Sequence, residues 1–484
     1  MIGRLAVRSL AAHPVRSAVL AAGFGLGVAV MAILLGVAQI VLEQSRAPAL
    51  VGGGDVIVST AAHVPARLLL AGTLQADALR PRIRAAAPSH RATLFLLRGD
   101  RRIPVTAVGG IPSLQRAVGD REAAGIAAWR DSPDDLAWAQ QTPEQTLRYI
   151  DRFHPVPDVP AWADSWAEWL YFNGRAGGVR FYLTFLVGPT TDDGRRAAGV
   201  RLQLDRGTRV ETFSASQPIT EAEALAAPDL TIGRSAVRLD GMRYRVHLDL
   251  LDEAGRRVVG DLTLEASAGR LVPPIEIAGA RGWRTGYVVP VMSGALDGAL
   301  EVDGERVSLA GGTGYHDHNW GFWEGVSWQW GQVQAGGDLS LLYGRVFPPP
   351  EAADPDRLPA FVGVLGPDGP IGYAHTLGPL GRTSRVTITE TDDASGRPAA
   401  ITVTARGGDL DLQVTFVVES MVTTPAAGSG ARGSGLDFLQ MRGTYTVTGR
   451  AGTRPLQFTA PGSAETFRGR APSARQSARG AGGG

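Results

Sequence analysis

The sequence Gly-Tyr-His-Asp-His-Asn-Trp-Gly, residues 314–321, puts two histidines, an aspartate, an amide and an indole side by side. If this stretch is a β-strand, successive side chains point to opposite faces of the sheet. The two faces then carry different groups: His316, His318 and Trp320 on one, and Tyr315, Asp317 and Asn319 on the other. Most of the remaining chain is a bland mixture of Ala, Gly, Val, Leu and Arg, so chemistry is expected here.

The flanking sequence also alternates as strands do. Asp303-Gly304 separates two alternating runs, which is a strong hairpin signal. Residues 326–334 and 339–345 alternate as well. Two pairs share a face within these runs: Trp328 with Trp330, and Tyr343 with Arg345. Short alternating strands joined by turns favour a β-sandwich or a β-barrel.

Two motifs resemble one known family. Residues 314–321 resemble the signature of carotenoid 1,2-hydratase (hydroxyneurosporene synthase) and AttH-like proteins, a lipocalin-like superfamily. Glu168-Trp169-Leu170-Tyr171 resembles the Glu-Trp-Trp-Tyr strand of that family, with Leu170 in place of one tryptophan. The resemblance covers about residues 150–470. It implies a mainly β fold with two consecutive lipocalin-like β-barrel halves, residues 154–310 and 311–467, around an apolar pocket.

The resemblance also implies a function. Family members include cofactor-free hydratases that add water across a terminal double bond of an isoprenoid. We therefore expect a hydratase or isomerase that protonates an alkene of a hydrophobic isoprenoid or lipid, with no cofactor and no metal. The candidate catalytic residues are His318, Trp320, Tyr343 and Asp317. The candidate substrate-binding residues are His316, Asn319, Trp328, Trp330, Arg345 and Trp169.

Alkene hydration places physical requirements on such a site. The proton donor must face apolar surroundings, which shift its pKa toward a useful value. An aromatic face stabilises the carbocation by ~1–2 kcal/mol. At the position of Arg345 the family pattern has an aspartate, and a guanidinium cannot usefully replace it as a donor. His318 is then the expected donor, with Asp317 as a substitute acid on the opposite face.

Other interpretations of the cluster stay open. His318, Asp317 and Asn319 suit a buried polar network that ties a barrel closed. The spacing of four residues resembles that of the ligands in a cupin metal site: His316, His318, Glu324 and His375. The glutamate, however, lies further along the sequence than it does in a cupin. The lone His154 is expected to be a surface or satisfied core residue, and Glu168 to be structural. The chain as a whole is also compatible with a non-catalytic, lipid-binding accessory of an ABC exporter.

The N-terminus has the pattern of a membrane anchor. Ala18–Leu42 contains no charged residue. At 1.5 Å per residue such a helix exceeds the ~30 Å hydrocarbon core of a bilayer. Arg4, Arg8 and Arg16 precede it, which puts the N-terminus in the cytoplasm and the large domain outside. The competing interpretation is a signal peptide cleaved near Ala47-Pro48-Ala49, although the apolar run is long for one.

Three parts of this region resemble the start of an FtsX/MacB-type ABC-transporter permease: Leu5–Leu10, Pro14–Ser17 and Gly53–Val58. Such permeases have further spans, whereas the sequence predicts a single one here. The segment is expected to act as an anchor and stalk, or to dock on a permease complex. The expected order is a cytoplasmic N-terminus (1–16), a transmembrane helix (17–42), a stalk with a small α+β module (43–153), the two β halves and a disordered tail (468–484).

Composition and local sequence signals further limit the possible partners, the possible chemistry and the position of the domain boundary. The formal net charge is +1, so no global field favours nucleic acid as a partner. The absence of cysteine excludes disulfides and thiolate chemistry, and the absence of lysine excludes Schiff-base catalysis. Thr142-Pro143-Glu144 predicts a helix start, with the helix ending near Phe153. The proline-rich run His154–Pro160 predicts a domain boundary.

Overall fold

The computed structural model describes residues 65–76, 79–99, 101–336, 339–354, 360–367, 369–375, 385–407, 409–425 and 436–469, with a few single residues elsewhere. The predicted transmembrane helix 17–42, the permease-like start and the tail beyond Gly469 fall outside these ranges. Among the residues that are described, no helix has both the length and the hydrophobicity needed to cross a bilayer. The chain divides into two compact units, residues 1–59 with 84–137, and residues 60–83 with 138–484.

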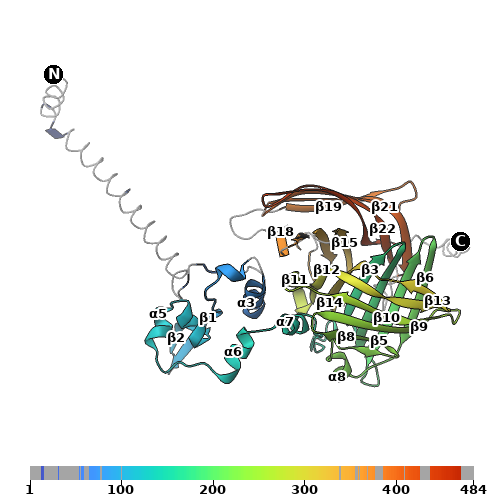
Figure 1. Cartoon of the computed structure of the whole chain (residues 1–484). Coiled ribbons are helices and arrows are strands. Elements are labelled where there is room, and N and C mark those ends of the chain that lie inside the picture. The colour runs from blue at the N-terminus through green and yellow to red at the C-terminus, as the bar shows by residue number, and fades with distance from the viewer. Residues whose placement is uncertain are drawn as a thin grey trace, which may run out of the picture. The chain divides into compact units, whose positions relative to one another are not determined.

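The first unit contains a β-hairpin and short helices (Figure 1). β1 (Ser89–Arg98) pairs antiparallel with β2 (Arg101–Gly110). α4 (Pro112–Ala117) and α5 (Arg121–Gly125) follow, and α6 (Pro133–Ala139) runs across the boundary between the units. Asp120 caps α5, since its carboxylate accepts hydrogen bonds from the backbone of the next turn.

The second unit, here called the β unit, contains α3 (Ala66–Gln75), η1 (Arg80–Arg82), α7 (Pro143–Ile150) and η2 (Ala163–Ser165) ahead of its strands. α7 starts with a capping box in which Thr142 and Gln145 satisfy each other's backbone N–H groups. Leu147 and Ile150 of this helix are buried in the main core. Residues 138–153, which precede the predicted boundary near His154, therefore belong to the β unit together with residues 60–83.

The first sheet of the β unit closes into a barrel. Its path runs β10-β12-β14-β3-β4-β5-β6-β9, and β9 pairs back onto β10. The strands are β3 (Trp166–Ala176), β4 (Val179–Thr190), β5 (Arg196–Arg206), β6 (Arg209–Ser216), β9 (Arg243–Leu251), β10 (Arg257–Glu265), β12 (Arg284–Val302) and β14 (Gly312–Phe322). Shorter elements join them: α8 (Glu221–Ala224), β7 (Thr231–Ile232), β8 (Ser235–Asp240), β11 (Val272–Ala278), η3 (Ala280–Gly282) and β13 (Glu305–Ser308).

The predicted hairpin at Asp303-Gly304 is confirmed. Val302 of β12 pairs with Glu305 of β13. Asp303 and Gly304 have φ angles of 53° and 84°. Consecutive positive φ angles are the geometry of a tight hairpin turn, which Asp-Gly adopts at little cost.

The second sheet is an open near-barrel with its own core. Its order is β18-β17-β16-β15-β23-β22-β21-β20-β19. The strands are β15 (Ser327–Ala335), β16 (Leu339–Phe347), β17 (Phe361–Gly366), β18 (Gly369–His375), β19 (Arg385–Asp392), β20 (Pro398–Gly407), β21 (Leu410–Pro425), β22 (Leu436–Ala451) and β23 (Arg454–Gly469). Figure 1 shows its later strands in orange and red.

The predicted mainly β class with two barrel-like parts is confirmed, but the boundary between the parts differs. The sequence predicts that the second half opens at residue 311, with β14 as its first strand. Instead β14 lies inside the first barrel, paired with β12 on one side and β3 on the other. The second sheet begins only at β15. Residues 468 and 469, which the sequence assigns to a disordered tail, belong to β23.

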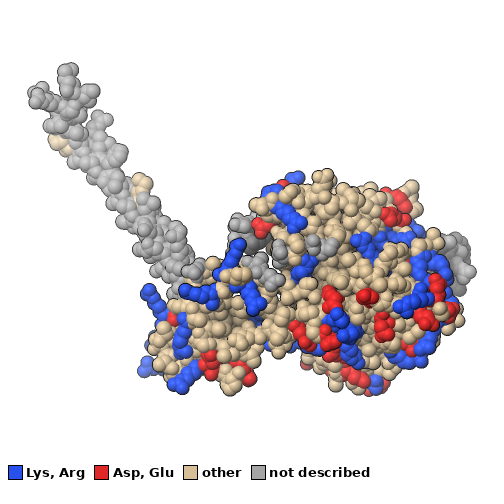
Figure 2. All heavy atoms as spheres, in the orientation of Figure 1, with Lys and Arg blue, Asp and Glu red and all other residues tan. Residues whose placement is uncertain are grey.

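The two sheets meet through a buried aromatic layer. Tyr171, Tyr182 and Tyr315 of the first sheet pack with Trp330 and Leu342 of the second. On the outer surface, basic and acidic side chains are interspersed over the face of the β unit seen in Figure 2. The first sheet therefore borders two interiors, the barrel core and the layer between the sheets.

Candidate functional site

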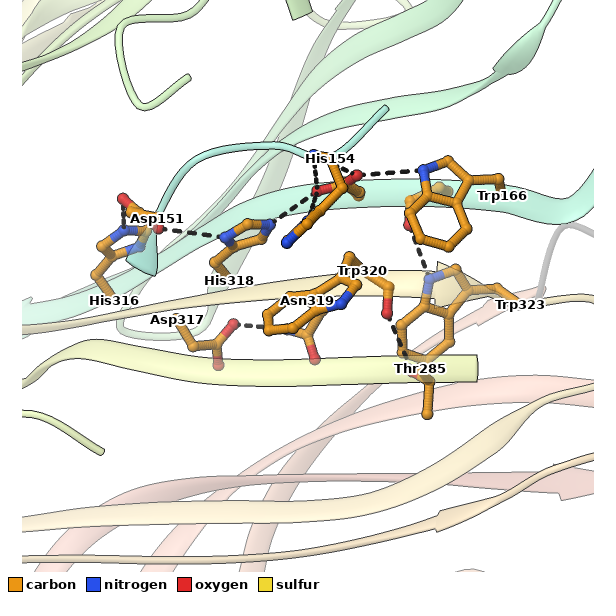
Figure 3. A network of polar contacts seen from close by, with 12 residues as sticks. Asp151, His154, Trp166, Thr285, His316, Asp317, His318, Asn319, Trp320 and Trp323 are labelled. Atoms are coloured by element: carbon orange, nitrogen blue, oxygen red, sulfur yellow. Dashed lines mark hydrogen bonds and ion pairs between the residues drawn. The ribbon is translucent and has the colours of Figure 1, made fainter. Parts of the chain in front are cut away.

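Strand β14 carries the polar stretch and faces both interiors. Its side chains alternate as the sequence predicts: Figure 3 shows His316 and His318 on one side of the strand and Asp317 on the other. Trp320 belongs to the barrel core, and Tyr315 belongs to the layer between the sheets. Two separate polar networks result, one on each side of β14.

The barrel-side network joins two histidines to two carboxylates. His316 Nε2 lies 2.9 Å from Asp151 Oδ2, and its Nδ1 lies 3.0 Å from the Tyr171 carbonyl oxygen. His318 Nε2 lies 3.2 Å from Glu168 Oε2, and its Nδ1 lies 3.6 Å from Asp151 Oδ1. The side chains of both histidines and both acids are at most 1% exposed. The network ties the end of α7 to β3 and β14.

Glu168 is the second hub of this network. Its Oε1 accepts hydrogen bonds from the His154 backbone N–H at 2.9 Å and from Trp166 Nε1 at 3.1 Å. Burial raises the pKa of Glu168, but hydrogen bonds from His154 and His318 outweigh burial and lower it overall. The pKa of Asp151 is lowered in the same way, since its pairing with a histidine overcomes burial. Both carboxyls are thus held ionised inside the barrel.

Aromatic rings pack directly against the histidines. Phe172 stacks on His316 with the ring centroids 4.1 Å apart, and Trp320 lies 5.1 Å from His318. The Trp320 indole also covers Gly286, where an added Cβ would come within 2.0 Å of it. The environment expected for His318 is a roomy apolar hollow. The structure instead gives this imidazole two carboxylate neighbours and close ring contacts.

The candidate catalytic residues His318, Trp320 and Tyr343 do not lie together. Tyr343 is fully buried in the core of the second sheet, where its hydroxyl lies 3.4 Å from that of Tyr445. Burial raises the pKa of Tyr343. Arg345 follows two positions later on β16, with its guanidinium 4.8 Å from the Phe347 ring. On β16, Leu342 faces the first barrel, so strand alternation turns Tyr343 away from it.

The network on the other side of β14 centres on Asp317. Its Oδ2 accepts a hydrogen bond from the Tyr315 hydroxyl at 2.9 Å, and its Oδ1 accepts one from the Asn319 amide at 2.8 Å. The Tyr315 hydroxyl lies 2.6 Å from the Tyr287 hydroxyl, which also accepts a bond from Trp330 Nε1 at 3.1 Å. A continuous chain of hydroxyls thus leads from a buried carboxyl to the half-buried Tyr287 ring.

Asp317 is the most strongly perturbed acid of this layer. Burial raises its pKa well above the ordinary range for aspartate, and the nearby Glu465 raises it further by like-charge repulsion. Hydrogen bonds from Tyr315 and Asn319 lower the pKa of Asp317, but by less than burial and Glu465 raise it. A buried carboxyl with these neighbours is biased toward its neutral, protonated form. The carboxyl of Asp317 can therefore act as an acid.

Glu465 of β23 brings a second carboxyl into the layer. It accepts hydrogen bonds from the Tyr171 hydroxyl at 3.3 Å, Trp328 Nε1 at 3.0 Å and Gln440 Nε2 at 3.3 Å. Burial raises its pKa, and these bonds oppose the rise. Trp328 also packs near Trp169, with the ring centroids 6.1 Å apart. The two acids therefore share a layer rich in aromatic rings.

The predicted site residues fall into three places. Those in or beside the layer between the sheets are Asp317, Asn319, Trp328, Trp330 and Trp169. Those in the barrel are His316, His318 and Trp320, and those on the far side of β16 are Tyr343 and Arg345. Sequence reasoning missed Tyr287 and Glu465, because each lies in an ordinary alternating strand with no motif around it. It also missed Asp151, whose position at the end of a predicted helix gave no sign of histidine partners.

A small cavity of about 20 Å³ also lies between the sheets. It is lined by Asn173, Tyr182, Gln332 and Ser463 among others. This volume suits a single water molecule rather than an organic ligand. The half-buried rings of Trp169, Trp323 and Trp328 are a more suitable surface for an apolar molecule.

Comparison with solved structures finds three proteins to which parts of this chain are similar. An AttH protein from Nitrosomonas europaea matches with a TM-score of 0.40 and 16% identity, over 63% of this chain and 92% of that one. Kievitone hydratase from Nectria haematococca matches with a TM-score of 0.40 and 14% identity, over 66% and 96%. CghA matches with a TM-score of 0.38 and 13% identity, over 69% and 96%. The sequence matches no model of a protein family and no curated protein. The permease resemblance of the N-terminus gains no support from these comparisons.

Proposed function

We propose that the protein is an acid catalyst that protonates a carbon–carbon double bond of a largely apolar substrate and so hydrates or cyclises it. The observation that carries this proposal is the position of Asp317, a buried carboxyl that is hydrogen-bonded to Tyr315 and Asn319 in an aromatic layer, where burial and the nearby Glu465 raise its pKa. A neutral carboxylic acid at physiological pH is the form that general acid catalysis needs. The family resemblance of residues 314–321 supports the same reaction class.

Tyr315 and Tyr287 suit the role of a proton relay. When Asp317 is protonated, it can donate to the Tyr315 oxygen, and Tyr315 can then donate to Tyr287. The Tyr287 oxygen already accepts a hydrogen bond from Trp330. Its own proton is then free to point toward a bound substrate. Tyr287 is half-buried, so in this proposal it is the group of the relay that meets the substrate.

The proposed reaction balances without a cofactor. The proton adds to one alkene carbon, the π electrons form the new C–H bond, and the neighbouring carbon becomes a cation. The tryptophan faces stabilise this cation by ~1–2 kcal/mol. A lone pair of water then forms the C–O bond, and the surplus proton returns to the Asp317 carboxylate. In a cyclisation, a second double bond replaces water, and its proton loss restores the acid.

The proposed substrate is an isoprenoid or another unsaturated lipid. The aromatic side chains around Asp317 and Glu465 suit a hydrocarbon better than a charged metabolite. The uncharged run Ala18–Leu42 suits a single membrane anchor, and we propose that the β unit lies on the extracytoplasmic side. Such a protein would take its substrate from the adjacent bilayer.

The proposal is tested with the full-length protein in detergent micelles. The protein is incubated with extracted lipids and defined polyisoprenoids in heavy-oxygen water. Mass spectrometry then detects labelled hydration products and isomeric cyclised products. Asp317→Asn keeps the size of the side chain but removes the acid, and it should lower turnover by about 100- to 10,000-fold. Tyr287→Phe should reduce turnover while leaving the Asp317 carboxyl in place.

The matched control is Asp192→Asn, since Asp192 is an exposed acid in a loop. This variant should convert substrate at the wild-type rate. Full turnover by Asp317→Asn would show that the proton comes from another group and would reject the proposal. Loss of activity in both Asp317→Asn and the control would point to a general defect of the preparation.

A second candidate function is a non-catalytic, lipid-binding accessory of an ABC exporter. One observation favours it. The β1–β2 hairpin exposes the apolar residues Leu94, Phe95, Leu96 and Leu97, which suit contact with a lipid or with an apolar surface of a partner. This function predicts that the wild-type protein binds lipid, copurifies with a permease and releases no altered product. Detection of a product that depends on Asp317 would exclude it.

A further inference from the structure

We propose that His154, Glu168 and His318 form a binding site for a divalent transition-metal ion inside the barrel of the β unit. This site is separate from the acid layer of the proposed function, since it lies on the opposite side of β14. Within the described residues, these three side chains offer ligand atoms that all lie within 4.8 Å of one another. They come from the segment after α7, from β3 and from β14.

The distances between donor atoms are close to those of a metal site. Glu168 Oε2 lies 3.1 Å from His154 Nδ1 and 3.2 Å from His318 Nε2. A tetrahedral ion with bonds of about 2.0–2.1 Å separates its ligand atoms by about 3.3–3.4 Å. The two distances from Glu168 Oε2 to the histidine nitrogens therefore need to lengthen only slightly to match such a site. The nitrogen–nitrogen edge can close by rotation of His154, whose side chain is 34% exposed.

Glu168 is already held in the orientation that ligation requires. Its Oε1 accepts hydrogen bonds from the His154 backbone and from Trp166 Nε1. Oε2 is the oxygen that both imidazoles approach, and it shares the His154 backbone N–H at 3.1 Å; we assign this oxygen to the ion. Ligating carboxylates in metal sites commonly have their other oxygen fixed in this way.

A second, independent observation comes from Asp151. Its Oδ1 and the Nδ1 of His318 are both buried without a hydrogen-bond partner, although they lie only 3.6 Å apart. His316 holds the other oxygen of Asp151 at 2.9 Å. If His318 binds an ion through Nε2, its Nδ1 carries a proton directed at Asp151. Ligating histidines usually make such a bond to a carboxylate, so ion binding satisfies both orphaned atoms.

The charge of the cluster also suits a divalent cation. Asp151 and Glu168 place two carboxylates where side-chain exposure is at most 1%. Buried charge is costly unless it is compensated. One divalent ion carries the charge that balances both carboxylates.

The donor set narrows the identity of the ion. Imidazole and carboxylate ligands suit Zn²⁺ and its first-row neighbours, whereas Ca²⁺ and Mg²⁺ need more oxygen atoms. The exposed edge of His154 is the entry route, and a water molecule would complete the coordination there. The Trp320 ring, 4.8 Å from His154, forms the wall of the site.

The test uses the full chain in detergent, purified without a polyhistidine tag and stripped with a chelator. Calorimetry follows Zn²⁺, and visible absorption follows Co²⁺ as a spectroscopic probe. We expect one equivalent of Zn²⁺ to bind, and an intense Co²⁺ band typical of four- or five-coordination to appear. His154→Ala should abolish both signals. Asp151→Asn should weaken affinity by about 10- to 100-fold.

The matched control is His247→Ala, because His247 is an exposed histidine paired with an acid on another part of the barrel. It should bind metal as the wild type does. Failure of the wild type to bind either ion would overturn the proposal, as would unchanged binding by His154→Ala. The half-exposed position of His154 makes this variant suitable for retaining the fold, which circular dichroism checks. Asp317→Asn should bind metal normally, so the two proposals fail or succeed separately.

Discussion

The Asp317→Asn variant should become more stable relative to the wild type as the pH increases. The quantity to measure is the difference between the free energies of unfolding of the two proteins. The variant keeps the shape of the side chain, an acceptor oxygen and the contacts with Tyr315 and Asn319. It removes the ability to ionise and, like the protonated acid, presents one acceptor and one donor, so Tyr315 accepts a hydrogen bond there instead of donating one. In the wild type, burial and the nearby Glu465 raise the pKa of Asp317 well above its unfolded value. The folded protein therefore opposes ionisation of this group more strongly than the unfolded chain does.

The sign and size follow from proton linkage. A group whose folded pKa is raised contributes its stability fully below the unfolded pKa, near 3.9 for aspartate. That contribution is lost as the pH rises toward the folded pKa. The loss is about 1.4 kcal/mol for each pH unit in this window. Asparagine does not titrate, so the stability of Asp317→Asn minus that of wild type should climb by this amount per unit and level off above the folded pKa.

The assay is urea unfolding of both proteins in mild detergent, followed by tryptophan fluorescence at several pH values from 4 upward. Asp192→Asn, which removes an exposed acid, should run parallel to wild type. A stability difference that does not vary with pH, or that falls as the pH rises, would refute the reasoning. Glu465→Gln should flatten the Asp317 effect, because neighbouring acids titrate as a coupled pair.

Three further predictions concern the fold around the site. Asp151→Ala should cost about 3–5 kcal/mol at neutral pH, because it removes the partner of two buried histidines. Since the pKa of Asp151 is lowered, this cost should shrink when the pH falls below its unfolded value, as denaturant titrations at each pH will measure. Gly286→Ala should destabilise the protein by about 1–3 kcal/mol, because the added Cβ would collide with Trp320. Thermal melting measures this loss, and Gly178→Ala, whose Cβ would meet nothing within 4 Å, is the control. Thr142→Ala should cost about 0.5–2 kcal/mol by removing the cap of α7, and an unchanged melting temperature would contradict this.

Much of the fold could be predicted from local sequence patterns. The Asp303-Gly304 turn was predictable, because few residue pairs adopt positive φ angles cheaply. The start of α7 was predictable from Thr142 and Pro143, since capping involves groups only a few residues apart. The end of the first barrel was not predictable. β14 pairs with strands far away in the sequence, and no local pattern encodes such partners.

Which residues of β14 share a side could be predicted from the order of the residues, because alternation of side chains follows from the covalent geometry of a strand. This geometry alone separates His316 and His318 from Asp317, whatever the neighbouring strands are. The groups that each side contacts, in contrast, depend on how distant parts of the chain pack together. This packing placed Asp151 and Glu168 against the histidines, Glu465 near Asp317, and Tyr343 in another core. The burial of each carboxyl and the charges around it depend on residues from distant strands. These residues therefore set the pKa of each carboxyl, and so decide which one is ionised and which one can carry a proton.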